Sequence, residues 1–162
     1  MLVVLLACGE PPRPDLRFHT PKATVDTLLE SYGLESVSQE EVRRRMRLGR
    51  RFHLVDPAAR DACFDVPIGR VEEGLVGFVF GSLAPTKDDM RISISGESAH
   101  VFGETLPGRP NTPVVLRRDG EGNWRIALYE SVPARVRRRL AEAARAPEQG
   151  AAAAQGTRGS TP

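Results

Sequence analysis

Residues 114–129 read VVLRRDGEGNWRIALY, and this segment carries the clearest signal of tertiary structure in the chain. Its centre, Asp119-Gly120-Glu121-Gly122, is typical of a hairpin loop, because glycine readily adopts the positive φ angles of tight turns. Downstream, Trp124, Ile126 and Leu128 stand at every second position, so they share one face of a strand. We therefore expect these three side chains to be buried together. The two expected strands are Val114–Arg118 and Asn123–Tyr129.

The same alternation occurs upstream of this hairpin. Residues 90–94 read MRISI, in which apolar and polar side chains alternate, and this predicts a strand with one buried face. Gly96-Glu97 then turns the chain toward a second strand that ends near Val101, and a proline-rich loop at residues 107–113 leads to the hairpin. Together the four strands predict an antiparallel meander.

Four helices are expected before this sheet and one after it. Thr20-Pro21, Ser38 and Asp56-Pro57 each place an N-cap side chain at a helix start, in two cases with a proline in the first turn. The run 74–83 has no polar face and is expected to be a buried helix. The expected helices are Thr20–Gly33, Ser38–Phe52, Asp56–Phe64, Gly74–Leu83 and, after the sheet, Pro133 to about residue 146. The inward positions of the second helix are Val42, Met46, Gly49 and Phe52.

The composition fits one folded domain with tails. The chain has 162 residues, of which 40% are hydrophobic and 27% charged, as in ordinary globular proteins. Two cysteines are too few for a disulfide framework, so apolar burial must stabilise the fold. We expect an α+β domain: N-terminal helices followed by a curved antiparallel sheet, a C-terminal helix and a disordered tail. The expected boundaries are 1–7 for a residual signal peptide, 8–19 for a tether, 20–145 for the domain and 146–162 for the tail.

The segment Leu5-Leu6-Ala7-Cys8-Gly9 resembles the lipobox of bacterial lipoproteins. The resemblance implies a mature chain that begins at a lipidated Cys8 and is anchored by membrane lipid in the cell envelope, at the periplasmic face of the outer membrane. Residues 1–7 hold no Lys or Arg, and an upstream start codon would supply the basic region of a signal peptide. Residues 9–17 carry three prolines, which is typical of an extended spacer. The alternative is a buried N-terminal strand with an ordinary cysteine.

The order of elements, helices first and then a meander whose last hairpin reads Gly122-Asn123-Trp124-Arg125-Ile126, is similar to that of the nuclear-transport-factor-2-like proteins. The resemblance covers residues 20–129 and implies a curved sheet wrapped around the first helix. The resulting cone holds a small molecule in the enzymes of that fold and is filled by side chains in other members. Fold alone does not select between these two outcomes.

Cone enzymes of that fold commonly use an Asp and a His as acid and base. Asp26, Asp56, His53 and Tyr32 are the residues here that could border a cone. Asp56 already has a sufficient role as a helix N-cap, and Asp26 directly follows the inward-facing Val25. We therefore assign no catalytic residue.

The sequence predicts no metal site and no cofactor. His19, His53 and His100 are isolated, and the chain has no H-E-x-x-H, no C-x-x-C and no phosphate-binding glycine loop. His100 alternates with Ala99 and Val101 and should face away from their side of the sheet. Cys63 is expected to behave as a small buried hydrophobe. A disulfide between Cys63 and Cys8 is the alternative if the lipobox interpretation fails.

Arginine dominates the positive charge of the chain. Twenty-one of the 23 basic residues are arginines, because Lys22 and Lys87 are the only lysines, and residues 43–51 hold six of them. In a cytosolic protein such a cluster would favour nucleic-acid binding. A chain lipidated at Cys8 meets no nucleic acid of its own cell, and its arginines would instead face anionic headgroups. The simpler alternative is a solvated helix face. The residues expected at headgroups are Arg43, Arg44, Arg47 and Arg51.

The function expected from these features is that of a membrane-anchored envelope lipoprotein with a small non-catalytic, cone-like domain in a structural or ligand-binding role. The alternative is an isomerase-like or dehydratase-like cone enzyme that acts on a small organic molecule. A cavity with two converging ionisable side chains would favour the enzyme. A cone plugged by Trp124, Phe78 and Phe80 would favour the non-catalytic domain.

Overall fold

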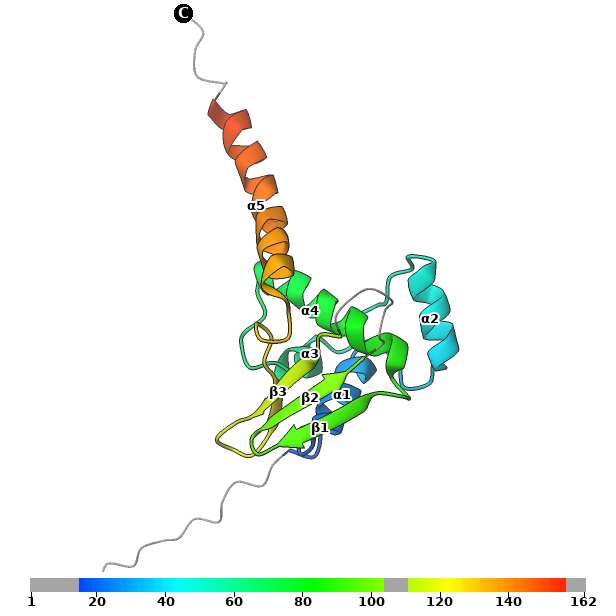
Figure 1. The fold of residues 1–162 in the computed structure, drawn as a ribbon. Coiled ribbons are helices and arrows are strands. Elements are labelled where there is room, and N and C mark those ends of the chain that lie inside the picture. Colours follow the sequence, from blue (N-terminus) through cyan, green and yellow to red (C-terminus); the bar gives the residue numbers. More distant parts are fainter. Residues whose placement is uncertain (1–14, 104–110, 157–162) are drawn as a thin grey trace, which may run out of the picture.

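The computed structural model describes residues 15–103 and 111–156, with side chains through residue 145. It confirms an α+β fold in which helices precede an antiparallel sheet and a further helix follows it (Figure 1). The helices are α1 (Pro21–Glu30), α2 (Gln39–Arg47), α3 (Pro57–Ala62), α4 (Arg70–Leu83) and α5 (Ala134–Gly156), with a short 3-10 turn, η1, at Ala84–Thr86. The strands are β1 (Arg91–Ser95), β2 (Ser98–Phe102), β3 (Val114–Arg118) and β4 (Trp124–Ile126).

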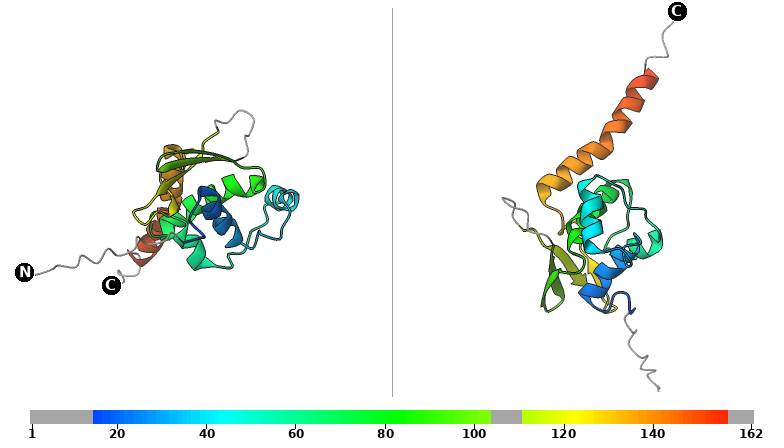
Figure 2. Two further views of the ribbon diagram at one scale, coloured as in Figure 1. Left: turned by 90° about the horizontal axis from the view of Figure 1, so that it is seen from below. Right: turned by 90° about the vertical axis from the view of Figure 1, so that its right-hand side faces the viewer.

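The four strands form the predicted meander. Their order is β1-β2-β3-β4, and each strand is antiparallel to its neighbour. The register places Ala99 opposite Ile94 and Leu116, and Leu116 opposite Ile126, so one row of apolar side chains crosses the sheet. Helices α1 and α4 pack against this sheet, as Figures 1 and 2 show from three directions. Ile94, at the outer end of the row, is 59% exposed, so its expected burial is wrong.

Helix α1 forms as the sequence predicts and fixes β4 to the helical layer. Thr20 caps it by accepting a hydrogen bond from the Ala23 N–H at 3.0 Å, and Gly33 ends the turn that follows with φ +66°. The Thr24 hydroxyl donates to the Trp124 carbonyl at 2.8 Å in a buried position. The same hydroxyl also lies 3.3 Å from the Thr20 carbonyl oxygen, and its shorter bond to Trp124 ties the helix to the strand.

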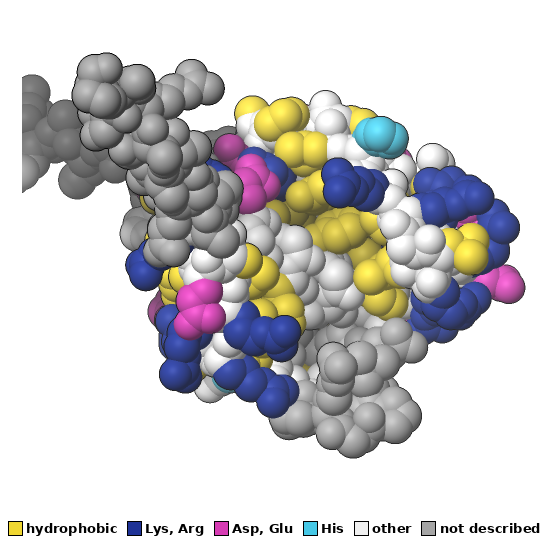
Figure 3. Space-filling view, turned by 90° about the horizontal axis from the view of Figure 1, so that it is seen from above, with side chains coloured by type: hydrophobic (Ala, Val, Ile, Leu, Met, Phe, Trp, Pro, Cys, Tyr) yellow, Lys and Arg dark blue, Asp and Glu magenta, His cyan; other side chains and the backbone are white. Residues whose placement is uncertain are grey.

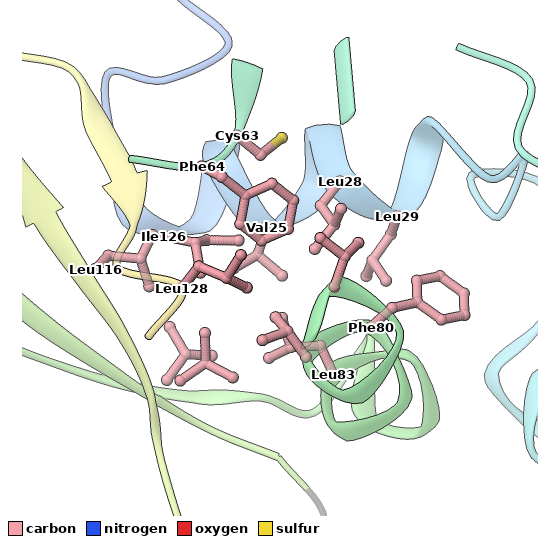
Figure 4. Close-up of a cluster of buried hydrophobic side chains, with 14 of the residues drawn as sticks. Val25, Leu28, Leu29, Cys63, Phe64, Phe80, Leu83, Leu116, Ile126 and Leu128 are labelled. Carbon is pink, nitrogen blue, oxygen red and sulfur yellow. The ribbon is translucent and has the colours of Figure 1, made fainter. Parts of the chain in front are cut away.

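The core lies between α1, α3, α4 and the sheet, and Figure 4 shows its side chains converging from these elements. Trp124, Ile126 and Leu128 are all buried, which confirms the prediction made for them. The strand itself stops at Ile126, because the segment after α3 takes over the pairing: the Ile126 N–H donates to the Cys63 carbonyl at 2.7 Å. The Leu128 N–H then donates to the Asp65 carboxylate at 3.0 Å.

Helix α2 ends earlier than predicted. Gly49 has φ +63° and donates its N–H to the Met46 carbonyl, while the Arg50 N–H reaches the Arg45 carbonyl, each at 3.0 Å. These two bonds are the pattern of a glycine-terminated helix end. The prediction that the helix continues to Phe52, with Gly49 as an inward position, is therefore wrong.

Helix α4 begins one turn before the predicted Gly74. Glu72 reaches back to accept a hydrogen bond from the Gly69 N–H at 3.1 Å, which satisfies a donor at the helix start. The last helix, α5, continues as backbone helix to Gly156, past residue 145 where the sequence placed the end of the domain. Residues 157–162 of the predicted tail lie outside the described residues.

The first described residue, Asp15, lies inside the segment 8–19 that the sequence assigned to a tether, and part of that segment packs on the domain. Phe18 is only 2% exposed and belongs to the core, and its carbonyl accepts a hydrogen bond from the Trp124 N–H at 2.7 Å. The Asp15 N–H donates to the Asn123 side chain at 2.9 Å. Cys8 and the predicted signal segment 1–7 lie outside the described residues.

The burial of Trp124 predicts the cost of removing its side chain. This indole is 6% exposed and sits where α1, β4 and the Phe18 segment meet. Trp124→Ala should lower the free energy of unfolding by about 3–5 kcal/mol, measured by chemical denaturation. Trp124→Phe should cost less, because the phenyl ring refills part of the space. A loss below about 1 kcal/mol for the alanine variant would contradict this packing.

Candidate functional site

A pocket of about 700 Å³ lies between α2, α4 and the start of α5. In Figure 3, hydrophobic side chains gather in the middle of this face and basic side chains stand beside them. The segment entering β3 and the η1 turn complete the walls. The lining residues are Arg43, Met46 and Arg47 of α2, Gly77, Phe78, Gly81 and Ser82 of α4, Pro85, Gly103, Asn111, Thr112, Pro133, Arg135 and Val136.

One face of α4 packs in the core, and the other face lines the pocket. One face is buried in the core through Leu75, Val76, Val79, Phe80 and Leu83. The other face turns Gly77 and Gly81 toward the pocket, and a Cβ atom placed on either glycine would meet no neighbour within 4 Å in the part of the chain that the structure describes. The helix therefore presents bare backbone to the pocket, with Phe78 as the large side chain between the two glycines.

One wall of the pocket depends on a close approach of two segments. Gly103, directly after β2, lies so near α4 that a Cβ atom there would stand 2.1 Å from the Ser82 carbonyl oxygen. Such a distance is impossible for any residue with a side chain unless the backbone moves. Glycine at this position therefore allows the end of β2 to lie against the pocket side of α4.

Three arginines supply the positive charge of the pocket. Arg43 is half-buried and held in place, because its Nε donates to the Pro85 carbonyl at 2.7 Å and its guanidinium lies 3.9 Å from the Asp89 carboxylate. Arg47 and Arg135 are exposed and have no hydrogen-bonded or ionic partner among the described residues. The pocket thus joins an apolar floor to guanidinium groups that are available to an anion.

The described lining lacks the groups used in acid–base catalysis. Its only ionisable side chains are the three arginines, which stay protonated at any physiological pH. The Ser82 hydroxyl donates to the Phe78 carbonyl of its own helix at 2.9 Å, so no base activates it. The lining can bind and orient an anion, but within the described residues it offers no proton donor or acceptor of ordinary strength.

The four residues that could have bordered a cone do not line this pocket. Asp26 pairs with Lys22 at 2.7 Å, Asp56 caps α3 by accepting from the Ala59 N–H at 2.9 Å, and His53 is exposed. Tyr32 packs its ring on Phe80, with centroids 4.3 Å apart. Each therefore has a local structural role or faces solvent, and no catalytic group is assembled from them.

Sequence reasoning missed a buried charge at Arg60. Its side chain is 8% exposed and forms ion pairs with Asp61 at 2.7 Å and with Glu73 at 2.9 Å, so it ties α3 to α4. Burial raises the pKa of the neighbouring Tyr32, which therefore stays neutral and also contacts this guanidinium. No local sequence pattern predicts this ion-pair cluster, because Arg60 and Glu73 stand on different helices.

The arginines of the 43–51 cluster divide into two groups. Glu41 accepts hydrogen bonds from Arg44 and Arg45, each at 2.7 Å, and these bonds lower its pKa to about 2. With Arg43 also held internally, the exposed arginines without a partner among the described residues are Arg47, Arg50 and Arg51. Leu48, between them, is 59% exposed. Of the four arginines expected at headgroups, Arg43 and Arg44 therefore have internal partners.

Within residues 15–103 and 111–145, whose side chains are described, no cluster of three or more His, Cys, Asp or Glu side chains could hold a metal ion. The side chain of His100 points to one face of the sheet, and those of Ala99 and Val101 point to the other face, as predicted. No helix in this part of the chain combines the length and apolar character needed to cross a bilayer.

No known protein family, no curated protein and no solved structure matches this chain.

The thiol of Cys63 should be inert in the folded protein. It is fully buried, its Sγ lies 3.2 Å from the Ala59 carbonyl oxygen, and burial raises its pKa to about 12. In the Cys8→Ala protein, where Cys63 is the only thiol, iodoacetamide at pH 8 should therefore label almost nothing until denaturant is added. Rapid labelling of the native protein, followed by mass spectrometry, would refute this assignment to the core.

Proposed function

We propose that this chain is a bacterial envelope lipoprotein, anchored through Cys8, whose domain binds a small anionic molecule without transforming it. The observation that carries the ligand-binding part is the pocket between α2, α4 and α5. Its volume of about 700 Å³ lies within the usual range of small-molecule sites.

The chemistry of the lining supports an anionic ligand. Arg47 and Arg135 have no partner among the described residues, and Arg43 is pre-positioned by its bond to Pro85. Guanidinium groups match carboxylate and phosphate oxygens in geometry and charge. No Asp or Glu belongs to the described lining, and the Asp89 carboxylate, 3.9 Å from Arg43, lies outside it.

A non-catalytic role agrees better with this site than the enzyme alternative. The space between α1 and the sheet is packed with core side chains, including the buried Trp124 and Phe80. Phe78, expected to help plug a cone, is instead half-buried and lines the pocket. The ionisable groups that do converge are arginines, which bind charge but do not exchange protons at neutral pH.

The tether limits where the domain can sit. Cys8 precedes the first described residue, Asp15, by seven positions, so a fully extended spacer reaches about 25 Å. Figures 1 and 2 place the start of the described chain on the side of the domain opposite α2. In the simplest orientation, a domain anchored there turns the pocket side toward the aqueous compartment.

Lipidation at Cys8 is tested by mass and partitioning. The natively expressed protein should begin at Cys8, carry acyl chains and enter the detergent phase, because two or more chains give stable membrane anchoring. The Cys8→Ala variant should be soluble. A mature protein that retains residues 1–7 without acyl chains would refute the anchor and leave the pocket proposal to its own tests.

A second contact, with an anionic surface, is supported by the end of α2. Leu48 is exposed between three arginines that have no partner in the described part of the chain, Arg47, Arg50 and Arg51. An apolar side chain among cations is typical of a membrane-surface contact. Because α2 and the chain start lie on opposite sides, the domain must tip over its tether for both contacts to reach one bilayer.

The α2 contact is tested with the soluble Cys8→Ala protein and phosphatidylglycerol vesicles. Binding should weaken as salt rises, because exposed charges are screened over about 10 Å at 0.1 M salt. The triple variant Arg47→Gln, Arg50→Gln, Arg51→Gln should lose binding at unchanged thermal stability. The matched control Arg138→Gln, Arg139→Gln, Arg145→Gln removes equal charge from α5 and should still bind. Equal loss in both variants would indicate net charge alone and contradict a dedicated surface.

A further inference from the structure

Two glycines in the middle of α4 cost the helix stability. Gly77 and Gly81 stand one turn apart within Arg70–Leu83, and glycine in a helix is less favourable than alanine because it loses more backbone freedom on folding. Glycine is usually required there by a positive φ angle or by a close neighbour. Neither residue is among the positive-φ glycines, and within the described residues neither has an atom from outside its own helix backbone within 4 Å of its Cβ position.

Other glycines on and near α4 show the contrast. A Cβ atom at Gly74 would touch Leu140 of α5 at 3.4 Å, and one at Gly103 would collide with the Ser82 carbonyl. Packing therefore accounts for a small residue at these positions. At Gly77 and Gly81, by contrast, none of the described neighbours requires a small residue, and the missing side chains leave space in the pocket.

We propose that this bare face of α4 holds the unbranched hydrocarbon chain of an anionic amphiphile, whose head group lies among Arg43, Arg47 and Arg135. This inference rests on the proposed ligand-binding function and names its ligand class. The backbone strip at Gly77 and Gly81 accepts a narrow chain, while Met46, Phe78 and Val136 supply apolar contacts beside it. Carboxylate and phosphate head groups share the chemistry that the guanidinium groups recognise.

A small ligand fits this face better than a second copy of the chain. A symmetric dimer through the pocket would bring the same arginines of both copies toward one another. Like charges facing across an interface are strongly unfavourable. An amphiphile brings the opposite charge and also covers the apolar floor, so it satisfies both features of the lining.

The test uses calorimetric titration of the soluble Cys8→Ala protein with decanoate and decyl phosphate, below their micelle concentrations. Both should bind with a one-to-one stoichiometry, whereas decyltrimethylammonium and inorganic phosphate should bind at least about tenfold more weakly, because each lacks one of the two features. The difference between decanoate and decyl phosphate identifies the preferred head group. Equal binding of the cationic amphiphile would overturn the proposal.

Substitutions on α4 test where the hydrocarbon chain of the ligand binds. Gly77→Leu and Gly81→Leu should each abolish decanoate binding, because their side chains occupy the strip where the hydrocarbon chain would lie, while the control Gly74→Ala, outside the pocket lining, should bind like the parent protein. Gly77→Ala and Gly81→Ala provide smaller changes. Each should raise Tm by about 2–4 °C and weaken binding. Unchanged binding in folded Gly77→Leu and Gly81→Leu proteins would overturn the proposal.

Arginine substitutions locate the head group. Arg47→Gln and Arg135→Gln should each weaken decanoate binding by about tenfold, as expected for the loss of a charge-assisted hydrogen bond, and leave binding of neutral decanol unchanged.

The binding results separate the amphiphile proposal from the wider proposal that the pocket binds an anion. A compact anion such as naphthalene sulfonate that binds in the pocket, while decanoate and decyl phosphate do not, would overturn the chain-shaped ligand and leave anion binding intact. Absence of binding by every anion tested would overturn both. A dimer in sedimentation analysis that dissociates in Gly77→Leu would assign the bare face to self-association and would also overturn the proposal.

Discussion

The division of α4 into a packed face and a bare face is the constraint on which the rest of this structure depends. Leu75, Val79 and Leu83 lock one side of the helix against α1 and the sheet. On the other side of the helix, α5 packs near Gly74 and the end of β2 lies against Ser82, while the strip at Gly77 and Gly81 between them carries no side chain. This strip, bordered by the arginines of α2 and α5, forms the floor of the pocket.

The elements with strong local signals could be predicted from the sequence. Thr20, Ser38 and Asp56 each cap a helix as expected, and the alternation around Trp124 predicts the buried face of the last strand. The errors arise where two signals compete. Gly49 fits both the apolar spacing of a longer helix and a left-handed helix end. The structure has the left-handed end, where the N–H groups of Gly49 and Arg50 find carbonyl partners in α2.

The candidate site was much less predictable, because it is assembled from segments far apart in the chain. Arg43, Gly77 and Arg135 belong to three helices, and nothing in local spacing indicates that they meet. The arginine cluster was visible in the sequence, but its internal bonds to Glu41 and Pro85 were not. One signal was available: two glycines four residues apart inside the apolar run 74–83 place a strip without side chains on one face of the predicted helix.

The central claim, that this bare face is a binding surface, is tested most directly by recording the backbone amide spectrum of the ¹⁵N-labelled Cys8→Ala protein during titration with decanoate. Glycine amides resonate in a separate region, so the pocket can be followed residue by residue. The account predicts that the signals of Gly77, Gly81 and Thr112 move together and saturate, while those of Gly33 and Gly96, which lie outside the pocket lining, stay in place. Saturable shifts confined to residues away from α4, with Gly77 and Gly81 unmoved, would contradict it.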